Sequence, residues 1–187
     1  LNGKEYELDS EMTAIGDESG VLSLAGVMGG QSSGCTDETI NVFIEIALFD
    51  PVRTAATGRK LNLESDARHR FERGVDPAFT EPGMEAATRL VQDMCGGEAS
   101  ELVVAGTMPE WRREVTFRPS RVQALGGVEL NETACEAVLA KLGFQSHGVS
   151  FDHLVVEPPS WRGDIVGEAD LVEEVLRVHG FDKIPAV

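Results

Sequence analysis

The fold of the second half of the chain is decided by the stretch PPSWRGDIVGEADLVEEVLRVHGFDKIP, residues 158–185. Its apolar residues recur three and four positions apart, the spacing of one helix face, and Gly180 follows them as a C-terminal stop. The spacing predicts a helix that packs one apolar stripe against a core. The stripe consists of Leu171, Val172, Val175, Leu176 and Val178.

Upstream of this helix, the second half alternates strands and short helices. We expect a strand at 114–117, a short helix that ends near Gly126, and a second helix that Asn131 caps and Gly143 ends. Two further strands, near 144–147 and 154–157, form a hairpin. The order of helix, helix, hairpin and helix predicts a winged-helix-like domain.

The first half is strand-rich. Partly alternating segments predict strands at 4–8, 13–16 and 21–25, and turn residues 17–20 join the last two into a hairpin. Apolar residues at helical spacing predict a helix over 82–94, which Gly96 ends, and a short strand follows at 101–105. Residues 106–113, with Pro109 and mixed charge, predict a domain boundary. The chain as a whole is expected to be α+β.

The stretch NVFIEIALF, residues 41–49, is apolar at both alternating positions except at Glu45. Such a run predicts a strand that is covered on both faces. A carboxylate in a buried strand needs a partner, because burying an unpaired charge is costly. The residues leave two explanations open: either an arginine pairs with Glu45, or Glu45 faces a ligand.

A basic segment, residues 53–73, stands out in an acidic chain. It holds six of the 16 basic residues against three acids, whereas the formal net charge of the 187-residue chain is -16. Either these side chains pair with one another and with neighbouring acids, or they form a local contact for phosphate. The basic residues are Arg53, Arg59, Lys60, Arg68, Arg70 and Arg73.

Composition excludes several classes of protein. Hydrophobic residues make up 42% and charged residues 26%, as in ordinary globular proteins, and no apolar run approaches the roughly 20 residues of a membrane span. Cys35, Cys95 and Cys135 are too far apart for a zinc or disulfide pattern, so we expect a reducing, cytoplasmic setting. The start has neither a signal-peptide core nor an initiator methionine, and we expect the chain to begin within a longer protein.

An acidic group lies around the last helix. Three of its carboxylates follow the i, i+3, i+4 spacing of one helix side, and a fourth precedes the helix. The spacing fits a solvated acidic face, and it also fits the oxygen ligands that a hard cation such as magnesium takes. The acidic group consists of Asp164, Asp170, Glu173 and Glu174.

Three motifs together resemble the β chains of bacterial phenylalanyl-tRNA synthetases: AGVMGG (25–30), SDARHRFERGVDP with GMEAATRL (65–77 and 83–90), and the stretch 158–185. The resemblance covers essentially the whole chain. It implies that residues 1–110 are the later part of the tRNA-editing module and that residues 111–187 are the winged-helix-like fifth β-chain domain. It also implies a phenylalanine–tRNA ligase, a cytoplasmic assembly of two α and two β chains that acts on tRNA(Phe).

The same resemblance implies a site that hydrolyses tRNA(Phe) mischarged with tyrosine. Glu45 matches the residue that reads the tyrosine hydroxyl, and Gly29, Ser65 and Ala67 match its pocket. Relatives often carry threonine at the position of Ser65 and histidine at that of Glu64, and a histidine upstream of this region completes their site. No Ser/His/Asp or Cys/His arrangement is evident, so we expect water to be the nucleophile. We expect tRNA contacts from Arg59, Lys60, Arg68 and Arg70.

For the second domain, the resemblance implies a magnesium site that the acidic group shares with the α chain. ATP would be used by the parent enzyme and not bound by this region. Two other functions remain open: a non-catalytic piece that only docks the α chain, and a free-standing metal hydrolase built on the acidic group.

Overall fold

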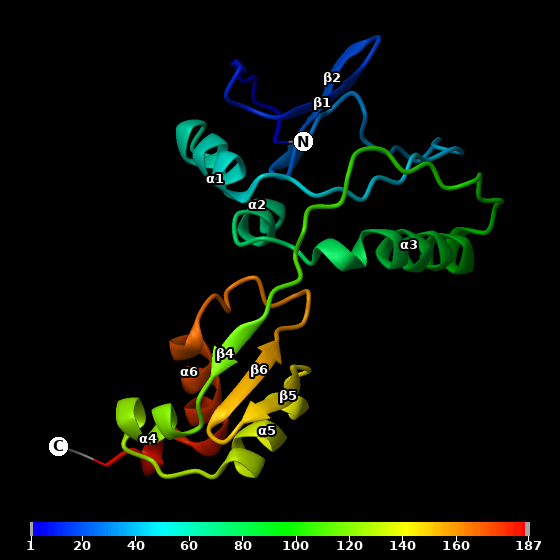
Figure 1. The fold of residues 1–187 in the computed structure, drawn as a ribbon. Helices are drawn as coiled ribbons and strands as arrows, with labels where there is room; N and C mark the ends of the chain where they lie inside the picture. The colour runs from blue at the N-terminus through cyan, green and yellow to red at the C-terminus, as the bar shows by residue number, and fades with distance from the viewer. Residues whose placement is uncertain (1, 186–187) are drawn as a thin grey trace. The chain divides into compact units, whose positions relative to one another are not determined.

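The computed structural model describes residues 2–185, which form helices and two small antiparallel sheets (Figure 1). The α+β class expected from the sequence is confirmed. The chain divides into two compact units between Gly106 and Thr107. Among the described residues, no helix is long and apolar enough to cross a membrane.

The sheet of the first unit has the order β1 (Ala14–Asp17), β2 (Gly20–Leu24) and β3 (Met28–Gly29). The expected hairpin of β1 and β2 is confirmed, and the side chain of Asp17 closes its turn by accepting from the Ser19 amide at 2.8 Å. The register places Ile15 beside Ser23 and Ser23 beside Gly29. These three residues therefore form one row across the sheet.

Two helices that the sequence analysis missed follow: α1 (Pro51–Lys60) and α2 (Asp66–Phe71). Each begins at a capping side chain, since Asp50 accepts from the Arg53 amide at 2.8 Å and Ser65 from the Arg68 amide at 3.0 Å. Asp50 followed by proline was the available signal for α1. Neither helix carries a long apolar stripe, so hydrophobic periodicity did not predict them.

The 3₁₀ turn η1 (Pro77–Phe79) leads into α3 (Thr80–Cys95), which confirms the helix expected at 82–94. It ends at Gly96, whose positive φ of 74° favours glycine.

The strands expected at 4–8, 41–49 and 101–105 are wrong, because the described residues form no strand there. The run 41–49 pairs with no strand of the described residues, and its start is exposed, with Val42 52% and Phe43 93% exposed. Its later apolar residues, Ile44, Ala47, Leu48 and Phe49, are only partly buried. The buried core of the first unit is correspondingly small. Its buried cluster consists of Met12, Leu24, Val27 and Leu63.

The sheet of the second unit has the order β4 (Val115–Phe117), β6 (His153–Glu157) and β5 (Gln145–Ser150). It packs with α4 (Ser120–Gly126), α5 (Glu132–Lys141) and α6 (Glu168–His179), and the 3₁₀ turn η2 (Phe181–Lys183) follows. The Asn131 side chain accepts from the Ala134 amide at 2.8 Å, which confirms the expected cap.

Four of the five residues expected in the apolar stripe of the last helix lie in the core of this unit, whereas Val178 is 42% exposed. Leu171 and Val175 are fully buried together with Phe117, Leu139 and Leu154. A Cβ at Gly126 would lie 2.4 Å from a methyl carbon of Leu176, so the glycine permits the close approach of α4 to α6.

Candidate functional site

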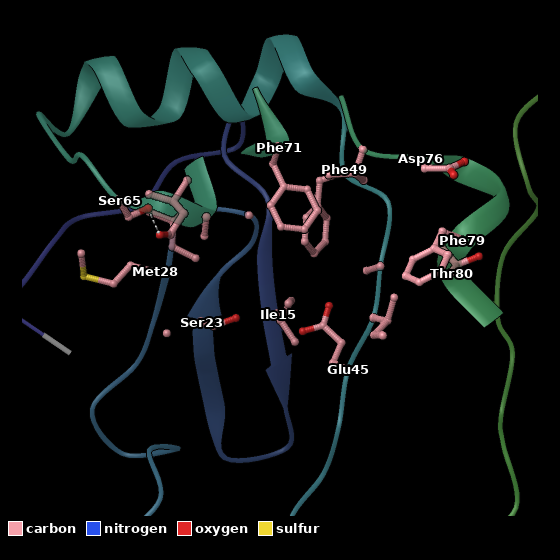
Figure 2. A pocket seen from close by; sticks show the side chains of 18 residues that line it. Ile15, Ser23, Met28, Glu45, Phe49, Ser65, Phe71, Asp76, Phe79 and Thr80 are labelled. Carbon is pink, nitrogen blue, oxygen red and sulfur yellow. Dashed lines mark hydrogen bonds between the residues drawn. The ribbon is translucent and has the colours of Figure 1, made fainter. Parts of the chain in front are cut away.

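A cavity of about 760 Å³ lies in the first unit, between the sheet, residues 45–49, α2 and the start of α3 (Figure 2). All four residues expected to form a pocket line it, although they come from separate parts of the sequence. They are Gly29, Glu45, Ser65 and Ala67. We call this space the aromatic cavity.

Phenylalanine rings give the cavity its character. The rings of Phe49 and Phe71 lie 5.0 Å apart between centroids at an interplanar angle of 52°, and Phe79 lines the cavity as well. Ile15 and Ser23 contribute the sheet side. Apolar walls of this kind suit an aromatic ligand. No sequence pattern singles out these residues, because only the fold brings them together.

Glu45 lines the cavity without a hydrogen bond or ion pair to any of residues 2–185. The arginine partner that the sequence left open is therefore absent from the described chain. The expected burial is also wrong, because Glu45 is exposed and its segment pairs with no described strand. The nearby wall still desolvates the carboxyl and raises its pKa. Glu45 is thus an available hydrogen-bond acceptor at the cavity.

Ser65 holds the cavity wall in place. Its hydroxyl donates to the Val27 carbonyl at 2.5 Å and accepts from the Arg68 amide at 3.0 Å. The first bond fixes the start of α2 against the loop between β2 and β3, and the second caps the helix. Ser65 therefore shapes the pocket through two internal bonds.

Of the four basic side chains expected to contact tRNA, two have partners within the first unit and two do not. Arg68 donates to the Leu63 carbonyl at 2.7 Å and to Glu72 at 3.0 Å, and Lys60 pairs with Asp9. Arg68 also lies across α1 so closely that a Cβ at Gly58 would sit 2.2 Å from its side chain. Arg59 and Arg70 are exposed and have no partner among residues 2–185. Only the second pair is available for a phosphate.

The acidic group of the second unit is engaged by internal donors. Glu174 is 7% exposed and accepts from Arg162 at 2.8 Å and from Arg177 at 2.6 Å, and these bonds lower its pKa to about 2. Arg162 also binds Asp164 at 2.7 Å. Asp170 accepts from two backbone amides at the start of α6, each at 2.9 Å.

This arrangement does not fit a metal ion. Within residues 2–185, no three His, Cys, Asp or Glu side chains are grouped to hold a cation. Of the acidic group, only the exposed Glu173 lacks a hydrogen-bond donor there. The arginines supply the positive charge that a cation would otherwise bring.

Comparisons with known proteins match both units of the chain to aminoacyl-tRNA synthetase sequences. A family model described as the B3/4 domain matches residues 1–96, and one described as the tRNA synthetase B5 domain matches residues 115–181. The phenylalanine–tRNA ligase beta subunit of Paramagnetospirillum magneticum is 59% identical over 100% of this chain and 23% of its own length. Those of Rhodospirillum rubrum and Cereibacter sphaeroides are 53% and 52% identical, over 100% and 98% of this chain and 23% and 22% of their own lengths.

The chain thus spans less than a quarter of the length of these relatives. The resemblance seen in the sequence motifs is confirmed.

Proposed function

The chain belongs to the B3/4 domain family, and from this premise we propose that it is part of a phenylalanine–tRNA ligase β subunit that removes mischarged tyrosine from tRNA(Phe). The observation that carries the proposal is the unpaired Glu45 carboxyl on a cavity walled by Phe49, Phe71 and Phe79. An aromatic side chain that carries one hydroxyl complements both features.

Glu45 supplies the selection for tyrosine over phenylalanine. The tyrosine phenol donates a hydrogen bond to the Glu45 carboxyl, and phenylalanine has no group to do so. A hydrogen bond to a charged group contributes about 1.5 to 3 kcal/mol, which is about 10- to 150-fold in selectivity. Desolvation raises the pKa of Glu45, but both protonation states keep an acceptor oxygen.

The chemical step is hydrolysis of the ester that joins tyrosine to the 3′ end of the tRNA. Water attacks the carbonyl carbon, the bond to the ribose oxygen breaks, and tyrosine and tRNA leave. The described residues that line the cavity include no histidine, so this region contributes recognition and positioning. We assign the orientation of the water to the rest of the site and the tRNA.

The second unit serves assembly in this proposal. It docks the α chain of a cytoplasmic enzyme with two α and two β chains, and ATP is consumed at a site that this region does not contain. The α chain would have to supply most of the magnesium ligands, because the acidic group is already engaged by donors of its own unit.

The test is deacylation of Tyr-tRNA(Phe) and Phe-tRNA(Phe), measured side by side with the ligase that contains this chain. Glu45→Ala should lower the preference for the tyrosyl ester by about 10-fold or more. Glu85→Ala is the matched control, because Glu85 is an exposed acid on α3 outside the cavity lining. A folded Glu45→Ala enzyme that keeps the wild-type preference would sink the proposal. If that enzyme still binds the α chain, the docking function alone remains.

A further inference from the structure

Helix α2 forms part of the wall of the aromatic cavity, although little packing holds it there. Its N-cap Ser65 lines the cavity together with Ala67 and Phe71 (Figure 2). The helix has six residues, none of them buried, and a helix this short is not stable by itself. Contacts on another face of α2 are therefore needed to fix the position of this wall.

The side chain of Arg68 supplies such contacts. Arg68 belongs to α2 but does not line the aromatic cavity. Its guanidinium donates to the Leu63 carbonyl at 2.7 Å and to Glu72 at 3.0 Å, and the side chain is only 15% exposed. Leu63 is a member of the buried cluster of the first unit. Arg68 thus ties α2 to the core of that unit.

Gly58 of α1 makes room for this arginine. Gly58 is buried, and a Cβ at this position would overlap the Cδ, Nε and Cζ atoms of Arg68, the three nearest atoms that it would meet. The Leu63 amide donates to the Gly58 carbonyl at 2.9 Å, so the same turn brings Leu63 to Arg68. Glycine is a poor helix former, and the close approach of Arg68 gives a physical reason for it inside α1.

The charge of Arg68 is already matched within the first unit. A phosphate could bind this guanidinium only by displacing Glu72 and the Leu63 carbonyl. Arg70 of the same helix is exposed and has no partner among residues 2–185. Of these two arginines, Arg70 is therefore the one available to a phosphate, and Arg68 acts on the structure.

We propose that Arg68 is a positioning residue for tyrosine selection, because it fixes the distance between the α2 wall of the aromatic cavity and the Glu45 carboxyl. The inference rests on the proposed function, which places the tyrosyl group in this cavity. Glu45 comes from a separate segment, so a ring held against Phe71 reaches the carboxyl only when α2 is in place. A hydrogen bond weakens steeply when its geometry is lost, whereas apolar contacts tolerate small shifts. Loss of the anchor should therefore reduce the discrimination between tyrosine and phenylalanine.

The test is a double-mutant cycle in the ligase that contains this chain, with Gly58→Ala, Arg68→Ala and both together. Deacylation of Tyr-tRNA(Phe) and Phe-tRNA(Phe) is measured for each enzyme. Gly58→Ala keeps the charge of Arg68 but displaces its side chain, and it should lower the preference for the tyrosyl ester by about three- to tenfold. In the Arg68→Ala background the new methyl group has no arginine to displace, so it should change the preference by less than about twofold.

Arg89→Ala is the matched control, because Arg89 is an exposed arginine on α3 outside the cavity lining. It should leave the preference unchanged.

Two further measurements separate positioning from other roles. Hydrogen exchange of the ligase should be faster at the amides of α2 in Gly58→Ala and in Arg68→Ala, and unchanged at those of α3. The slope of log KM for Tyr-tRNA(Phe) against log salt concentration should be the same in wild type and Arg68→Ala. A lost phosphate contact would instead reduce this slope by about 0.7.

Four results would overturn the inference: an unchanged preference in folded Gly58→Ala ligase, equal losses for the tyrosyl and phenylalanyl esters, additive losses in the cycle, or the smaller salt slope in Arg68→Ala. Glu45→Ala separates these results from failure of the proposed function. If Glu45→Ala lowers the preference and Gly58→Ala does not, the inference alone fails. If Glu45→Ala leaves the preference intact, the proposed function fails and tyrosine selection by Arg68 fails with it.

Discussion

Glu174 offers the sharpest test of how the second unit is held together. The substitution Glu174→Gln keeps the size of a side chain that is 7% exposed and removes the charge that Arg162 and Arg177 share. Arg162 retains Asp164, whereas Arg177 has no other ion-pair partner among residues 2–185. We therefore expect the substitution to weaken the contact of α6 with the segment that precedes it.

The magnitude follows from the pKa of Glu174. Hydrogen bonds from Arg162 and then Arg177 lower the pKa from 4.5 to about 2. At about 1.4 kcal/mol for each pKa unit, this corresponds to about 3 kcal/mol of folding free energy above pH 5. Glutamine still offers one acceptor oxygen, so we expect a loss of about 2 to 3 kcal/mol at pH 7.

The pH dependence has a definite sign. The pKa of Glu174 is lower in the folded than in the unfolded chain, so its stabilisation is complete above the unfolded value and disappears as the pH falls toward 2. The gap between wild type and Glu174→Gln should therefore shrink steadily from pH 5 to pH 2.

Urea unfolding followed by tryptophan fluorescence measures this gap, because both tryptophans, Trp111 and Trp161, belong to the second unit. Glu173→Gln is the control: Glu173 is exposed on the same helix, and its loss should change stability by less than about 0.5 kcal/mol. A Glu174→Gln loss below about 0.5 kcal/mol, or one that is equal at pH 7 and pH 3, would refute the reasoning.

Three further outcomes are expected of the isolated chain. Calorimetric titration with magnesium chloride should show weak binding at most, because the acidic group is engaged by arginines and backbone amides; tight stoichiometric binding would contradict this. Arg68→Ala should destabilise the first unit by about 2 kcal/mol, whereas Arg59→Ala should not, and equal circular-dichroism unfolding curves would show that Arg68 is no structural residue. Brief trypsin treatment should cleave at Arg112, which is exposed, before Arg113, which donates to three backbone carbonyls; a protected full-length core would argue against separate units.

Sequence patterns predicted the secondary structure best where the apolar periodicity and the end signals of an element lie within one segment. The helices at α3, α5 and α6 and the β1–β2 hairpin each carry periodicity and end signals within one segment. α1 and α2 were missed because their starts depend on single caps, at Asp50 and Ser65.

The segment 41–49 shows the opposite limit. Its apolar composition predicted a buried strand. Whether a segment is buried, however, depends on which other elements pack against it, and the local pattern does not contain that information. In this chain the segment pairs with no described strand, its start is exposed, and its later residues contribute one wall of a cavity instead. The pocket residues Gly29, Glu45, Ser65 and Ala67 came from the family resemblance, since no local spacing brings them together.

The basic segment is only partly available to nucleic acid. Lys60, Arg68 and Arg73 are bound to acids of the first unit, whereas Arg53, Arg59 and Arg70 have no side-chain partner among residues 2–185. Each phosphate contact to a single strand adds only about 0.7 to the slope of the logarithm of the binding constant against the logarithm of the salt concentration. The chain as a whole carries a formal net charge of -16. Electrostatic attraction at this surface is therefore weak. Under the proposed function, a tRNA end that binds here derives its selectivity from the aromatic cavity, where Glu45 offers an acceptor to the ligand.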